Sequence, residues 1–121
     1  MRHYIQSRIK SFQYAFEGLK PVLKGQKNMH IHILAAFVVI GAGVYFDITS
    51  TEWVAITCVI GFVWVCEFFN SAIETLANVV SSDYNKHIKQ VKDISAAAVL
   101  ISAITAVVVG VIVFWKYIIT M

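Results

Sequence analysis

Residues 94–115 read ISAAAVLISAITAVVVGVIVFW, a run without a single charged side chain. A helix rises about 1.5 Å per residue, so about 20 apolar residues are needed to cross the hydrocarbon core of a membrane. This run is long enough and predicts a transmembrane helix over 94–117. Applied outward along the chain, the same argument predicts two more spans, over 28–46 and over 53–82, the latter interrupted by Glu67.

The overall composition agrees with a membrane protein. Hydrophobic residues make up 59% of the 121 residues and charged residues 14%, whereas soluble domains have about 45–50% and about 25%. These values exclude an ordinary soluble domain, and a disordered chain would be poorer in apolar residues. We therefore expect an all-α integral membrane protein that forms one domain over residues 1–121.

The first 25 residues differ from the spans. Apolar residues recur there at helical spacing, with charged residues between them: Ile9, Phe12, Phe16, Leu19 and Leu23. This pattern predicts an amphipathic helix over 1–25 that lies in the membrane interface. Pro21 should bend or divide this helix, because its ring does not fit a helix interior.

The lysines and arginines predict the orientation of the chain. The net charge is +3, and nine of the ten Lys and Arg residues lie before residue 28 or in the 83–93 loop. The positive-inside rule places the N-terminus and this loop in the cytoplasm and the C-terminus outside. Because the cations flank apolar runs, we expect anionic lipid headgroups, and not nucleic acid, as their partners.

The second span carries one polar face. Glu67, Asn70, Glu74 and Asn78 fall within an arc of roughly 80° on a helix. A carboxylate inside a span costs about 2.5 kcal/mol or more, so it is a candidate functional group. Counted from Trp53, Glu67 lies about 21 Å and Glu74 about 32 Å along the helix. Glu67 is thus placed inside the inner leaflet and Glu74 near the cytoplasmic headgroups.

This difference in depth suits a base that acts on a lipid hydroxyl and a metal ligand that holds a nucleotide. The alternative is that both acids pair with Lys or Arg from neighbouring helices. Three thin spans should be unable to surround Glu67 from all sides. We therefore expect a second subunit, or the amphipathic segment of the same chain, to cover the polar face.

Polar residues also gather in the cytoplasmic loop. Lysines beside a metal held by carboxylates can bind phosphate, although plain topology charges are the alternative. The cluster consists of Asp83, Tyr84, Lys86, His87, Lys89, Lys92 and Asp93.

His30 and His32 are two residues apart, so they diverge on a helix and make a poor metal pair. The P-loop motif is absent, so nucleotide chemistry would need a different scaffold.

Two blocks of the sequence resemble a known family. CEFFNSAIETLANVV (66–80) is followed by SSDYNKHIKQVKDISAAAVLISAI (81–104), and SFQYAFEGLKPVLKGQKNMHIHILAA (11–36) precedes both. These segments resemble the prokaryotic diacylglycerol kinase family, which also includes the undecaprenol kinases. The resemblance implies a homotrimeric kinase of the bacterial inner membrane, with active sites shared between subunits. It would transfer the γ-phosphate of ATP, with Mg²⁺, to the hydroxyl of a lipid.

The resemblance also implies roles for individual residues. Glu67 would be the general base, Asn70 would orient the reacting groups and Glu74 would be a ligand of Mg²⁺. Lys92 would contact the phosphates, and Asp93 would hold the nucleotide side of the site. Further positions implied near the nucleotide or the reacting phosphates are Arg8, Tyr14, Asp83 and Tyr84.

Three positions depart from the family pattern, one of which is His30, where the family usually has an arginine. Gln26 aligns with a glutamate that holds the second metal, and Asn78 aligns with the acid that ends the first block. With fewer carboxylates, the site should hold Mg²⁺ more weakly.

Three interpretations remain: an active kinase with weaker metal affinity, an impaired variant, and a non-catalytic relative. We favour activity, with diacylglycerol as the first candidate substrate and undecaprenol as the second. The rival class is a small transporter that uses Glu67 as a cation site.

Overall fold

The computed structural model describes all 121 residues as four helices joined by short connections. Helix α1 spans Arg2–Gly25, α2 spans Lys27–Phe46, α3 spans Ser50–Val80 and α4 spans Lys86–Ile119. The last three are each long and apolar enough to cross a membrane. The prediction of an all-helical protein with three helices long and apolar enough to span a membrane is therefore confirmed.

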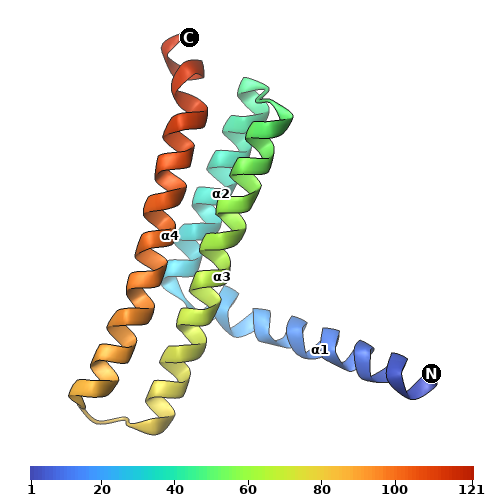
Figure 1. Cartoon of the computed structure of the whole chain (residues 1–121), viewed down its shortest axis with the longest axis vertical. Coiled ribbons are helices and arrows are strands. Elements are labelled where there is room, and N and C mark those ends of the chain that lie inside the picture. Colours follow the sequence, from blue (N-terminus) through green and yellow to red (C-terminus); the bar gives the residue numbers. More distant parts are fainter.

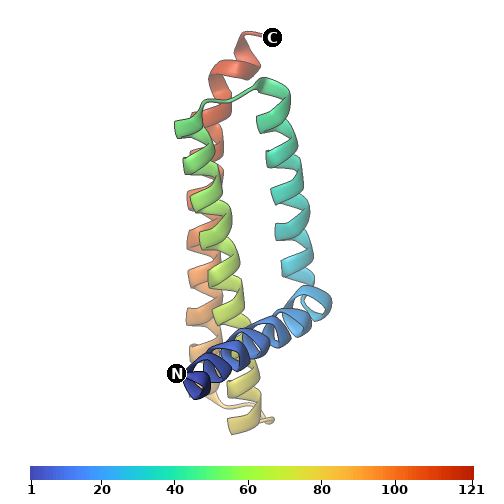
Figure 2. The same ribbon diagram turned by 90° about the vertical axis from the view of Figure 1, so that its right-hand side faces the viewer.

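The three long helices run alongside one another, and α1 projects away from them (Figure 1). Helices α3 and α4 pack closely, and α2 packs on α3. The α2–α3 turn and the C-terminus lie at one end of the molecule, and the α3–α4 loop lies at the other. Helix α1 joins α2 toward the end that carries this loop and crosses in front of the bundle (Figure 2).

Local sequence signals set the ends of the spans. Helix α3 begins with a capping box, in which Thr49 Oγ1 accepts a hydrogen bond from the Glu52 backbone and Glu52 Oε2 accepts one from the Thr49 backbone. Helix α4 begins after Asn85, whose side chain accepts bonds from two backbone N–H groups of the first turn. The basic segment 83–93 is therefore helical from Lys86 onward.

Helix α1 continues through Pro21 to Gly25, so the expected division at Pro21 is wrong. Only residues 22–25, about one helical turn, follow Pro21 before the helix ends. The chain instead leaves the helix at Gln26, whose backbone is extended with φ −104° and ψ 116°. The junction between α1 and α2 is thus one residue long.

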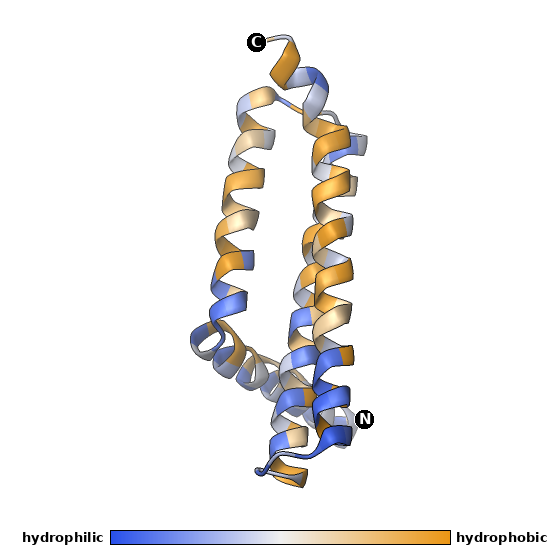
Figure 3. Ribbon diagram, turned by 90° about the vertical axis from the view of Figure 1, so that its left-hand side faces the viewer, coloured by the Kyte–Doolittle hydropathy of each residue, from blue (hydrophilic) through white to orange (hydrophobic).

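The apolar core lies toward the end of the bundle that holds the α2–α3 turn. Its buried members are Ile48, Ile56, Val113 and Phe114. Apolar residues cover most of the length of α2, α3 and α4, whereas hydrophilic residues gather on α1 and around the α3–α4 loop (Figure 3). The molecule therefore has one predominantly polar end, and the polar face of α3 extends toward it.

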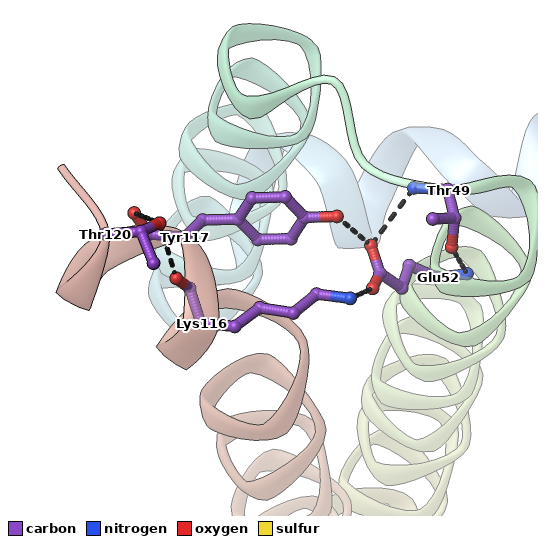
Figure 4. A network of polar contacts seen from close by, with 5 residues as sticks. All are labelled: Thr49, Glu52, Lys116, Tyr117 and Thr120. Carbon is purple, nitrogen blue, oxygen red and sulfur yellow. Dashed lines mark hydrogen bonds and ion pairs between the residues drawn. The ribbon is translucent and has the colours of Figure 1, made fainter.

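At the opposite end, Glu52 joins α3 to α4 (Figure 4). The hydroxyl of Tyr117 donates to Glu52 Oε2 at 2.6 Å. The ammonium group of Lys116 forms an ion pair with Glu52 Oε1. One carboxylate thus caps α3 and also holds the last turns of α4.

Candidate functional site

The polar face of α3 becomes steadily more exposed toward the α3–α4 loop. Glu67 and Asn70 are buried, Glu74 is half-buried and Asn78 is exposed. Glu67 is thus packed inside the bundle, and Glu74, about two turns further along α3, lies nearer the α3–α4 loop. A single helix therefore carries polar groups from the interior of the bundle to its polar end.

Glu67 is completely buried within one chain, with 0% of its surface exposed. Neither of its carboxylate oxygens has a hydrogen-bond partner. His32 Nε2, from α2, lies 3.4 Å from Glu67 Oε2. Glu67 is therefore covered within one chain, so its burial does not require a second subunit, and His32 lies against it on the side of α2.

Asn70 connects α3 to α4. The hydroxyl of Ser95 donates to Asn70 Oδ1 at 2.7 Å and also lies 3.0 Å from the carbonyl oxygen of Lys92. Ser95 and Asn70 are both buried. The oxygen of the Asn70 amide is therefore engaged, and its NH₂ group remains available as a donor.

Two lysines of α4 have different partners. Lys92 Nζ donates to Asn78 Oδ1 on α3 at 2.6 Å. Lys89 Nζ pairs with Asp93 Oδ2 at 2.6 Å, one turn along the same helix. Lys92 thus lies beside the polar face of α3, whereas Asp93 is exposed and its partner lies on α4 itself.

Glu74 forms no hydrogen bond and no ion pair, in contrast to these residues. The alternative that both acids pair with Lys or Arg is therefore wrong within one chain: Glu67 faces an imidazole, and Glu74 has no partner.

Gln26 lines a cavity of about 520 Å³ between the α1–α2 junction and α3, together with Ser71 and Thr75. No three His, Cys, Asp or Glu side chains come together as a metal site.

The remaining predicted residues are not gathered at this face. Arg8 and Tyr14 lie on the projecting helix α1, where both are exposed. The guanidinium of Arg8 lies 5.2 Å from the ring centre of Tyr4 on the same helix. Asp83 and Tyr84 are exposed in the α3–α4 loop. One chain thus brings together the residues of α3 and α4 but not those of α1.

Sequence reasoning missed two contributors to this region, His32 and Ser95. In the sequence, His32 stands out only as a poor metal partner of His30. The two histidines do diverge, since His30 Nε2 lies 2.8 Å from the Leu23 carbonyl oxygen whereas His32 faces Glu67. Ser95 is recognisable only as a small residue that permits close packing. Its bond to Asn70 depends on how α4 is rotated against α3.

The fold and this polar face define a multi-pass membrane protein with an intramembrane carboxylate and lysines at one end of the bundle. Residues 13–114 match the family model described as prokaryotic diacylglycerol kinase. The chain therefore belongs to the prokaryotic diacylglycerol kinase family. The predicted family and the predicted class of enzyme, a lipid kinase, are both confirmed.

Several curated proteins are similar over most of the chain. Undecaprenol kinase of Bacillus subtilis is 27% identical over 113 residues, which cover 93% of this chain and 92% of the relative. Diacylglycerol kinase of Escherichia coli K12 is 27% identical over 109 residues, which cover 90% and 89%. Diacylglycerol kinase of Synechocystis is 32% identical over 101 residues, which cover 83% of this chain and 58% of the relative.

Proposed function

We propose that this protein transfers the γ-phosphoryl group of ATP to the hydroxyl of a membrane lipid, with Glu67 as the general base. Diacylglycerol is the first candidate substrate and undecaprenol the second, in keeping with the names of the relatives. The observation that carries the proposal is the carboxylate of Glu67, which is fully buried in a membrane span and has no hydrogen-bond partner. A carboxylate in this setting is costly and is a functional group by default.

In the proposed reaction, the lipid O–H bond breaks and its proton moves to a carboxylate oxygen of Glu67. The lipid oxygen forms a bond to the γ-phosphorus while the bond between that phosphorus and the ADP oxygen breaks, with its electron pair leaving on ADP. Phosphoryl transfer is chiefly a matter of positioning and charge stabilisation. Asn70 supports the positioning role, because Ser95 fixes its oxygen and leaves its NH₂ group as a donor.

The nucleotide is assigned to the polar end of this face. Lys92 would contact the phosphates, Asp93 would hold the nucleotide side, and Asp83 and Tyr84 would lie near it in the loop. The half-buried carboxylate of Glu74 fits Mg²⁺, since it is an oxygen ligand without any other partner. When bound, Mg²⁺ would neutralise phosphate charge. Gln26 and Asn78 are neutral members of this part of the site, so we expect weak metal affinity.

Self-association would complete the site. Helix α1 carries Arg8 and Tyr14 away from the bundle (Figure 1), and one chain offers no cluster of three metal ligands. We propose a homotrimer in which α1 reaches the polar face of a neighbouring subunit. Exposed apolar residues such as Phe12 and Phe16 suit α1 to the membrane interface. The positions of Lys and Arg support a cytoplasmic N-terminus and an external C-terminus in the bacterial inner membrane.

Two measurements on the purified protein test the function. Vesicles that contain diacylglycerol or undecaprenol are incubated with [γ-³²P]ATP and Mg²⁺, and the labelled phospholipid is quantified. In parallel, the melting temperature is recorded with and without Mg·ATP, because a ligand at 100 times its Kd stabilises the fold by about 2.7 kcal/mol. We expect labelled lipid and a higher melting temperature. A transporter would give neither result, and a non-catalytic relative would give the thermal shift without labelled lipid.

A further inference from the structure

The contact between His32 and Glu67 goes beyond the roles assigned so far. His32 Nε2 lies 3.4 Å from Glu67 Oε2, and their side chains are 16% and 1% exposed. We propose that His32 is a positioning residue that holds the carboxylate of Glu67 in the orientation needed to accept a proton. This inference rests on the proposed function, in which Glu67 is the base.

The carboxylate needs such a partner. An ionised carboxylate buried without hydrogen bonds is strongly disfavoured, and both oxygens of Glu67 lack a hydrogen-bond partner. The distance of 3.4 Å is slightly longer than a typical N–H···O bond. Catalytic hydrogen bonds are often long in the absence of substrate and tighten in the reacting complex. A small movement of the imidazole would therefore supply the missing bond.

Other polar groups near this part of α3 are already engaged or make no contact with Glu67. The ammonium group of Lys92 donates to Asn78, and the hydroxyl of Ser95 donates to Asn70. The hydroxyl of Ser71 is buried but forms no hydrogen bond. His32 is thus the side chain whose nitrogen lies within ion-pair distance of the base.

His32 also lies between two cavities. One, of about 250 Å³, is lined chiefly by apolar residues of α2, α3 and α4. The other, of about 260 Å³, includes Asn70 and Asn28. His32 lines both, whereas Glu67 lines neither. The imidazole therefore contacts the buried base and also lines both cavities, a position from which it can orient the carboxylate.

The test compares lipid phosphorylation by His32→Gln, His32→Leu and Glu67→Gln. Gln places an amide donor close to the position of Nε2, whereas Leu has no donor. We expect His32→Leu to lower kcat by about 10- to 100-fold with the KM for Mg·ATP unchanged, the loss of one bond to a charged group. His32→Gln should stay within about fivefold of the parent. The double variant His32→Leu/Glu67→Gln should be no slower than Glu67→Gln alone, because residues that act as a unit are not additive.

Melting curves show whether each variant folds, and His30→Gln serves as the matched control, because His30 contacts the Leu23 carbonyl rather than Glu67. If His32→Leu does not fold, His32→Asn replaces it, since its shorter amide cannot reach the carboxylate. A parental kcat in His32→Leu, or an equal loss in the Leu and Gln variants, would overturn the positioning role while Glu67→Gln still shows its large loss of rate. Parental activity in Glu67→Gln would overturn the proposed base and this inference together.

Discussion

Lys92 Nζ donates a hydrogen bond to Asn78 Oδ1 at 2.6 Å, across the interface of α3 and α4. The lysine proposed to contact phosphate is thus held by one of the two neutral residues that depart from the family pattern. Asn78 is neutral, whereas an aspartate at this position would place a negative charge beside the ammonium group of Lys92. This relationship connects the geometry of the site with its expected metal affinity.

Restoring the two acids should therefore change the metal requirement. We expect Gln26→Glu/Asn78→Asp to lower the Mg²⁺ concentration needed for half-maximal activity by several-fold, because carboxylate charge strengthens binding of hard cations. The measurement is a Mg²⁺ titration of lipid phosphorylation at constant ATP. Thr51→Glu adds a charge at an exposed position at the opposite end of the bundle and serves as the control. An unchanged Mg²⁺ requirement would show that these two residues do not limit metal binding.

The bond between Ser95 and Asn70 should contribute to the rate. Ser95→Ala removes the hydroxyl that holds Asn70 Oδ1 at 2.7 Å. A typical hydrogen bond contributes about 1 kcal/mol, so we expect kcat to fall about fivefold. Steady-state kinetics on the lipid substrate check this value. Thr105→Ala is the matched control, because the Thr105 hydroxyl bonds only to a backbone carbonyl of its own helix. Equal rates for the Ser95 variant and the parent would remove Ser95 from the account.

The contact of Tyr117 with Glu52 should stabilise the opposite end of the bundle (Figure 4). Tyr117→Phe leaves the ring in place and removes the donor, so we expect a loss of about 1–2 kcal/mol in the free energy of unfolding. Thermal melting in detergent micelles measures this loss. Tyr45→Phe is the control, because Tyr45 is 74% exposed and forms no hydrogen bond. Equal destabilisation by both substitutions would contradict a specific role for the Tyr117 hydroxyl.

Gly43 should tolerate no side chain. A Cβ at Gly43 would lie 2.6 Å from Trp53 Cη2 and 3.1 Å from Ile48 Cδ1. Because the Trp53 ring is rigid, we expect Gly43→Ala to cost about 1–3 kcal/mol of stability. Gly41→Ala, two residues away, meets no atom within 4 Å and should be neutral or gain up to about 1 kcal/mol. The same melting assay compares the two variants. A Gly43→Ala protein at least as stable as Gly41→Ala would contradict the clash with Trp53.

The sequence allowed the spans to be predicted because long uncharged runs have few stable alternatives to a membrane helix. The polar face of α3 was predictable too, since Glu67, Asn70, Glu74 and Asn78 share one face through helical spacing alone. What the sequence could not provide was the rotation of one helix against another. The pairing of Ser95 with Asn70 and of His32 with Glu67 depends on that rotation.

The burial of Glu67 shows the same limit. The sequence left open whether a second subunit or the same chain covers it, and the structure buries it within one chain. Enclosure depends on how closely the helices approach, and small residues such as Ala36 and Ser95 permit this approach only where they meet another helix. The tertiary structure, and not the sequence pattern, determines which small residues face another helix.

The most direct test of the central claim is the rate of lipid phosphorylation by Glu67→Gln. The substitution keeps the size of the side chain and removes its ability to accept a proton. A positioned general base contributes about 10²- to 10⁴-fold, so we expect a loss of that order in labelled phospholipid. Asp47→Asn, at the far end of the bundle, is the matched acid-to-amide control and should keep the parental rate. A Glu67→Gln protein that folds and labels lipid as fast as the parent would contradict the account.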